Sequence, residues 1–180
     1  MHMSARCSVG RQQGFTLIEV LVSTLVLMVG ILGISAMQMI SFQTNQSAYM
    51  RSQATYLAQD MMDRIRSNRV GFQNSTVYDS VDTSQAGTIP ASPACISTAD
   101  GCSSIQLGEQ DIREWAQNFG NFDSVADYRP RLLGGRGTVT RGSGNEFTVL
   151  VEWDDRDYDA DGNLTREAGG RSVEITAVLF

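Results

Sequence analysis

A long apolar stretch near the amino terminus constrains the fold of this chain more than any other feature. Residues 20–37 are uncharged and mostly apolar, and no charged residue occurs between Glu19 and Arg51. A helix of about 20 such residues spans the hydrocarbon core of a bilayer. Arg6 and Arg11 precede the stretch, so the positive-inside bias predicts a cytoplasmic N-terminus and an outward-facing C-terminal part.

Glu19 is an anomaly in this stretch, because it lies about one helical turn inside its start. A carboxylate within a membrane span costs ~2.5–3.5 kcal/mol on insertion scales, and less near the interface. A single-span anchor, or a signal peptide cut near "GISA", would explain the apolar run but not the carboxylate. Two explanations of Glu19 remain: its side chain reaches the interface, or it pairs with a cation.

Cleavage between Gly14 and Phe15 would supply such a cation, because it creates an α-amino group at the start of the helix. The amine of a neighbouring helix, displaced along its axis, could then approach Glu19. The carboxylate would set the register between the two helices, a use of buried charge that is attested in coiled coils.

The nonapeptide "GFTLIEVLV" resembles the signal of type IV prepilins, with glycine before the cut and an aromatic residue after it. The resemblance implies that prepilin peptidase cuts after Gly14 and that Phe15 is N-methylated. It also implies that Glu19 pairs with a neighbour's N-terminus during fibre assembly. Residues 1–14 would then be a leader peptide.

The apolar helix is predicted to continue from Phe15 to about Asn68, because no proline occurs before Pro90. Residues 15–42 would form its transmembrane and assembly half, and residues 43–69 an amphipathic half. In the second half, apolar residues recur at helical spacing and predict one stripe that packs on a globular head: Met50, Ala54, Leu57, Ala58, Met61 and Ile65. The segment "RVGFQNST" predicts a stop at Gly71.

The segment "RSQATYLAQDMMDRIRSNR" is similar to a pattern of the PilV group of minor pilins, also called type IV pilus modification proteins. The resemblance is strong as far as Arg69 and looser beyond. Its charged residues either form an interface with other minor pilins or belong to a solvated helix face. The candidate interface residues are Arg51, Asp60, Asp63, Arg64 and Arg66.

Residues 70–180 are predicted to form the head, which makes the chain an α+β protein of the type IV pilin kind. Residues 72–108 are rich in small polar residues and predict loops with a short strand, and "EQDIREWAQNF" predicts a short helix anchored by Trp115. Residues 137–141, 146–153 and 171–180 are enriched in β-branched residues. They predict an antiparallel sheet that packs on the amphipathic half of the long helix.

Cys95 and Cys102 would lie outside the inner membrane in a pilin, where a disulfide between them is expected. Two thiols and the single histidine, His2, make a metal site or a catalytic thiol a poor alternative.

The segment "DRDYDADGN" has the opening spacing of a calcium loop at Asp157, Asp159 and Asp161. A calcium loop would need its closing glutamate at position 168, but that residue is alanine, and Glu167 lies one place early. A polar turn between the last two strands is the preferred interpretation, with a weak calcium site as the alternative.

The resemblance as a whole implies a non-enzymatic minor pilin without cofactor, which helps to prime pilus assembly and supports twitching motility and adhesion. It would sit in the inner membrane with a periplasmic C-terminus, and later in the pilus, with a tip location and a tip adhesin as further candidates. Its partners would be prepilin peptidase and other minor and major pilins, without a small-molecule substrate. The net charge of −6 disfavours nucleic acid.

Two alternatives share the same N-terminal signal: a minor pseudopilin of type II secretion, and a DNA-uptake or adhesive pilin. Two departures from major pilins favour a minor subunit: no proline interrupts the apolar helix, and no large C-terminal disulfide loop is present.

Overall fold

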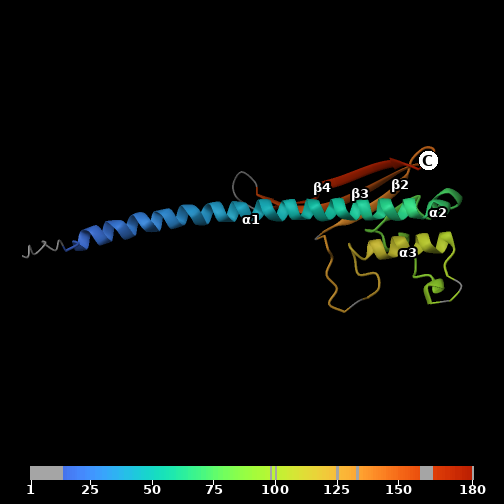
Figure 1. Ribbon diagram of the computed structural model, residues 1–180, viewed down its shortest axis with the longest axis horizontal. Helices are drawn as coiled ribbons and strands as arrows, with labels where there is room; N and C mark the ends of the chain where they lie inside the picture. Colours follow the sequence, from blue (N-terminus) through green and yellow to red (C-terminus); the bar gives the residue numbers. More distant parts are fainter. Residues whose placement is uncertain are drawn as a thin grey trace, which may run out of the picture. The chain divides into compact units, whose positions relative to one another are not determined.

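A computed structural model describes residues 14–97, 99, 101–124, 126–132, 134–158 and 164–179. The chain divides into two units between Thr44 and Asn45. The first unit contains the N-terminal part of helix α1 (Leu17–Ser67), and the second contains the rest of α1 and all other elements (Figure 1). The predicted long helix is therefore confirmed, with bounds one or two residues inside those expected.

The described part of the first unit, residues 14–44, consists of α1 and the three residues that precede it, and every side chain in it is exposed. An 18-residue window of this helix has a mean hydropathy of 2.5 and no buried residues. By length and composition the helix could cross a membrane.

The second unit is a head built from one sheet and three α-helical segments, the first of which is the C-terminal part of α1. The sheet has strand order β1-β2-β3-β4, with every neighbouring pair antiparallel. This arrangement confirms an α+β fold with a long N-terminal helix and an antiparallel sheet, as in type IV pilins. Besides α1, its elements are α2 (Arg69–Asn74), β1 (Ser80–Asp82), the 3-10 turns η1 (Ala86–Thr88) and η2 (Ala94–Ser97), α3 (Ser104–Ala116), β2 (Arg136–Arg141), β3 (Glu146–Tyr158) and β4 (Leu164–Val178).

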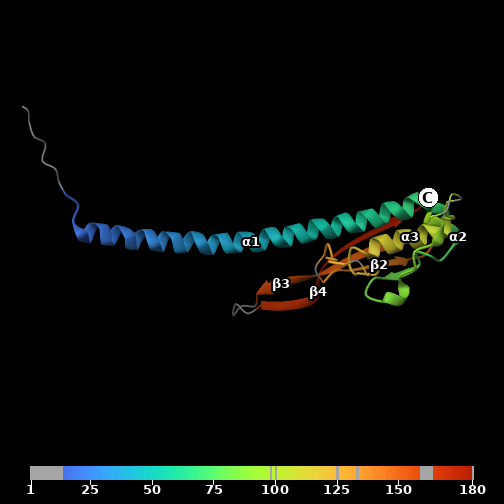
Figure 2. The same cartoon turned by 90° about the horizontal axis from the view of Figure 1, so that it is seen from below.

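The head core forms around the apolar stripe of α1, as the helical spacing predicted. Ala54, Leu57, Met61 and Ile65 have no exposed surface. They belong to one core cluster with the inward residues of the strands and with Trp115 of α3. Figure 2 shows α3 and the strands ranged along the C-terminal part of α1. Because strand residues alternate between faces, β2 and β3 each contribute every second residue to this core.

Two predictions about the segment after α1 are wrong. Gly71 does not stop a helix but lies buried inside α2, where an added Cβ would come within 2.6 Å of the Ser104 carbonyl oxygen. Residues 72–108 are not all loop, because α3 begins at Ser104. Its start is fixed by a capping box, in which Ser103 and Gln106 exchange side-chain and backbone hydrogen bonds.

The last two strands are longer than the β-branched runs indicated. Strand β3 continues to Tyr158, and β4 begins at Leu164. Asp157 therefore lies in β3, in register with Thr165, and not in a turn. Strand pairing outweighs the poor strand propensity of aspartate here. Asp159 and Asp161 lie outside the described residues.

Gly137 of β2 is required by the packing of Trp115. A Cβ at this position would lie 2.3 Å from Cη2 of the Trp115 indole, which is completely buried. We expect Gly137→Ala to lower the free energy of unfolding by about 1–3 kcal/mol, as overpacked cores do. Denaturant unfolding followed by tryptophan fluorescence measures this change.

Gly87→Ala is the matched control, since a Cβ at Gly87 meets nothing within 4 Å. Equal effects of the two substitutions would contradict the packing role of Gly137.

Candidate functional site

The N-terminal site residues lie at the start of α1. Gly14, Phe15 and Thr16 precede the helix, and Glu19 lies in its first turn, with its amide donating to the Thr16 carbonyl at 3.1 Å. A carboxylate in the first turn is favoured by the helix dipole. Phe15 is 84% exposed, so its ring is free for contacts outside the helix.

Glu19 has no basic residue near it in its own helix. Between residues 14 and 50 the sequence contains no arginine, lysine or histidine. The next basic residue along the chain is Arg51, which belongs to the second unit. A cation that pairs with Glu19 therefore has to come from outside this part of the helix.

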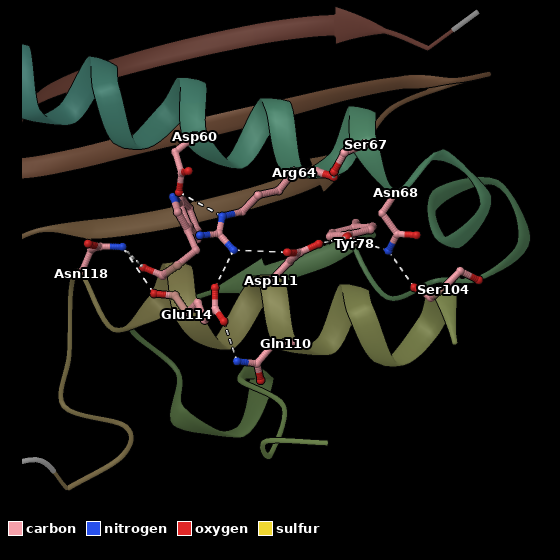
Figure 3. A network of polar contacts seen from close by, with 11 residues as sticks. Asp60, Arg64, Ser67, Asn68, Tyr78, Ser104, Gln110, Asp111, Glu114 and Asn118 are labelled. Atoms are coloured by element: carbon pink, nitrogen blue, oxygen red, sulfur yellow. Dashed lines mark hydrogen bonds and ion pairs between the residues drawn. The ribbon is translucent and has the colours of Figure 1, made fainter. Parts of the chain in front are cut away.

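In the head, Arg64 connects α1 to α3 (Figure 3). Its Nε donates to Asp60 one turn earlier at 3.1 Å. Its Nη1 donates across to Asp111 at 3.2 Å and to Glu114 at 2.9 Å. One guanidinium thus binds three carboxylates, and only 27% of its side chain is exposed. Charge-assisted bonds of this kind are stronger than those between neutral groups.

The same network continues through buried neutral groups to the end of α1. The Tyr78 hydroxyl donates to the second carboxylate oxygen of Asp111 at 2.8 Å. It accepts in turn from Nδ2 of Asn68 at 3.0 Å, and that amide also donates to the Ser104 carbonyl at 2.6 Å. Asn68 caps α2 through its other side-chain atom, which accepts from the Gly71 amide at 3.3 Å. Asn68 therefore joins the end of α1, the start of α2 and the start of α3.

The disulfide adjoins the start of α3. Cys95 and Cys102 are bonded with an S–S distance of 2.01 Å, and Cys102 immediately precedes the capping residue Ser103. Near the C-terminal end of α3, the Trp115 indole N–H donates to the Leu57 carbonyl of α1 at 2.8 Å. Helix α3 is thus fastened to α1 along most of its length.

Two family models match the chain. Residues 36–113 match the family described as "Type IV pilin Tt1218", and residues 10–35 match the prokaryotic N-terminal methylation motif. Over residues 10–113 the chain is therefore similar to type IV pilins. Comparisons with curated proteins and with solved structures gave no significant match.

Several residues of the segment 51–69 have a structural role in the head. Leu57 and Ala58 are core residues, and Asn68 forms the junction described above. Asp60 and Arg64, two candidate interface residues, are bonded to each other, and Arg64 is also bonded to α3. The other three candidates are exposed: Arg66 pairs with Asp63 at 3.2 Å on the same helix face, and Arg51 lies more than three turns before this pair.

No cluster of three metal-ligating side chains occurs among the residues that the structure describes. Of the calcium candidates, Asp159 and Asp161 lie outside that part of the chain, and only the backbone of Asp157 is described.

The network shifts the pKa values of its members in different directions. Burial raises the pKa of Asp111, and hydrogen bonds from Tyr78 and Arg64 oppose this shift only in part. Burial also raises the pKa of the Tyr78 hydroxyl. Hydrogen bonds from Gln110 and Arg64 lower the pKa of Glu114. Burial alone would lower the pKa of Arg64, but its carboxylate partners raise it above the ordinary value, so Arg64 stays charged.

Three residues of this network, Tyr78, Asp111 and Glu114, were not predicted from the sequence. The helical pattern of α3 offered one signal, because Asp111 lies beside Ile112 and four residues before Trp115, both core residues. A carboxylate that close to an apolar face needs a partner when it is buried. The spacing did not reveal which partner, because Arg64 is 47 residues away in the sequence.

Removing Arg64 should destabilise the head strongly. We expect Arg64→Met to lower the free energy of unfolding by about 2–3 kcal/mol, since it leaves the largely buried Asp111 without its cation. Arg66→Met is the matched control, because Arg66 makes only an exposed pair one turn apart. Its expected effect is within about 0.5 kcal/mol.

Denaturant unfolding of the full chain in detergent micelles compares the two variants. Equal stability losses in both would show that the bonds between Arg64 and α3 contribute little to the head.

Asp111 should also give the head a measurable pH dependence. Its pKa is raised in the folded state, so the folded state binds the proton more tightly than the unfolded chain. The stability of the natural chain relative to Asp111→Asn should therefore fall as the pH rises from about 4 through the raised pKa. The difference in unfolding free energy between the two chains, measured from pH 4 to 8, tests this sign. A rise over this range would show that Arg64 outweighs burial at Asp111.

Proposed function

We propose that this chain is a minor subunit of the PilV type, which joins other minor pilins to prime the assembly of a Gram-negative type IV pilus. A location at the pilus tip and roles in twitching motility and adhesion belong to the same proposal. The observation that supports it most is the combination of the methylation motif with an exposed apolar helix that begins at Leu17.

The proposed cycle begins in the inner membrane, with residues 15–42 as the spanning half of α1 and the head in the periplasm. Prepilin peptidase removes residues 1–14, and Phe15 is N-methylated. In the fibre the new amine of one subunit pairs with Glu19 of a neighbour. The absence of any basic residue from the helix between residues 14 and 50 supports a partner in another chain.

The exposed members of the motif remain available for contacts between subunits. Arg51, Asp63 and Arg66 are exposed on α1, whereas Asp60 is bonded to Arg64, and Arg64 is bonded to α3. We therefore limit the proposed minor-pilin interface on this helix to the three exposed residues. The two paired residues would act on that interface through the stability of the head.

Two arginines that could have contributed to a DNA-binding surface are paired within the head, which weakens the DNA-uptake alternative. Arg136 donates from Nε to Glu152 at 2.9 Å, and Arg141 pairs with Asp79 at 2.7 Å while its guanidinium stacks on the Phe72 ring. These arginines are neutralised within the head, so they do not form the continuous basic strip that a phosphate backbone requires.

Mass spectrometry of fibres sheared from the native cells tests the proposal. We expect a peptide that begins at N-methylated Phe15, because cleavage after Gly14 precedes incorporation. Glu19→Gln should be cleaved equally well but should appear in fibres at a much lower level, since it cannot pair with the amine. Ser23→Ala, one turn later on the same exposed helix, is the control.

Three outcomes would contradict parts of the proposal. Unprocessed chain alone would contradict cleavage at Gly14. Processed chain found only in inner-membrane fractions would contradict a location in the fibre. Loss of protein secretion with normal piliation after deletion would identify a pseudopilin of type II secretion instead.

A further inference from the structure

The two edges of the head sheet differ in length and protection. Strand β1 at one edge has three residues, and β4 at the other has 15. The strand order gives β4 a single hydrogen-bonded strand neighbour, β3. Natural proteins protect exposed edge strands from pairing with other chains. They make these strands short, cover them, or place proline and charged residues in them. β4 contains no proline, and Glu174 is the one charged residue between positions 172 and 178.

The end of the β1 edge is covered by the chain itself at Asp82. The Thr88 hydroxyl, at the end of η1, accepts from the Asp82 amide at 3.2 Å and donates to the Asp82 carbonyl at 2.5 Å. Both backbone groups of the last β1 residue are therefore satisfied. A strand from another molecule cannot pair there without displacing Thr88.

The β4 edge directs a row of backbone groups outward. The Leu179 amide donates to the Asn145 carbonyl at 3.0 Å, next to the register pair of Glu146 with Val178. Hydrogen-bonded and non-hydrogen-bonded pairs alternate in an antiparallel ladder. The odd-numbered residues of β4 therefore bond to β3 in this region. The even-numbered residues direct their N–H and C=O groups to the edge, and their side chains are exposed: Ser172, Glu174, Thr176 and Val178.

We propose that the edge of β4 from Ser172 to Val178 is a docking site for an edge strand of a different pilin subunit. An extended strand is the one partner that satisfies such a row of alternating donors and acceptors. A second copy of this chain does not fit, since its own first-strand edge is short and covered by Thr88. The inference rests on the proposed function as a subunit that assembles with other pilins.

Strand direction supports a partner anchored in the same membrane. In Figures 1 and 2, β4 runs in the same direction as the C-terminal part of α1. Antiparallel pairing of two β4 edges in one continuous sheet would thus make the C-terminal parts of the two α1 helices antiparallel. The partner strand can instead be antiparallel to the helix of its own subunit. When such a strand pairs antiparallel with β4, these parts of the helices of the two subunits are parallel. In this head β1 and β3 have that direction, so the first strand of a pilin with the same topology would suffice.

Photo-crosslinking of the full-length chain in its native cells tests the proposal. Benzoylphenylalanine replaces Glu174 at the edge, or Thr138 as the matched control. Thr138 is in register with Leu150 of β3, which is in register with Glu174, so the side chains at 138 and 174 lie on the same face of the sheet. Unlike β4, strand β2 has a neighbouring strand on both sides. We expect Glu174, but not Thr138, to crosslink to an extended segment of another pilin, identified by peptide mapping.

A second pair of substitutions tests the backbone itself. Thr176→Pro removes an outward N–H, which edge strands tolerate, and Thr176→Val changes the side chain but keeps the N–H. We expect about a tenfold loss of the crosslink from position 174 with proline, because a hydrogen bond and the strand geometry are both lost, and no loss with valine. Resistance of the head to limited proteolysis reports whether each variant folds.

The proposal is overturned by any of four results: equal crosslinking from positions 138 and 174, crosslinks to a second copy, no crosslink in fibres that contain the processed chain, or a folded proline variant with an unchanged crosslink. If the proline variant does not fold, the comparison of positions 138 and 174 decides alone. Absence of the processed Phe15 peptide from fibres would instead contradict the proposed function, which separates the two failures.

Discussion

The packing of the sheet and α3 on one stripe of α1 is the interaction on which the rest of the head depends. Ala54, Leu57, Met61 and Ile65 are fully buried there, and their partners come from α2, α3 and the strands of the sheet. At roughly 1.5–3 kcal/mol for a fully buried large side chain, this surface is a major source of the head's stability. The backbone of α1 takes part as well, since the Leu57 carbonyl accepts from Trp115.

The polar network at Arg64 adds specificity to this apolar packing. An apolar stripe alone permits α3 to slide or rotate, because hydrophobic contacts have no direction. The bonds of Arg64 to Asp111 and Glu114, and of Asn68 to Ser104, have direction and fix the position of α3 along α1. The disulfide beside Ser103 then holds the loop that leads into α3.

The head thus presents surfaces of different character. Where α1 meets α3, charged residues that look like surface groups in the sequence are bonded to each other. Strand β4, which is rich in β-branched residues, has a strand neighbour on one side only. The backbone N–H and C=O groups on its other side are exposed at the edge of the sheet. The proposed contacts with other subunits accordingly use the exposed residues of α1 and the backbone of β4, and not the most highly charged part of the motif.

Local patterns in the sequence sufficed for the long helix, for the stripe of Met50 to Ile65, and for the three C-terminal strands. Helical and strand periodicities report which face of an element is buried, and the N-terminal motif is contiguous. Tertiary structure alone decided that Arg64 meets Asp111, that the start of α3 lies beside Asn68, and that β4 rather than β1 is the open edge. These features join residues tens of positions apart, and sequence periodicity carries no information about which distant element a given face will meet.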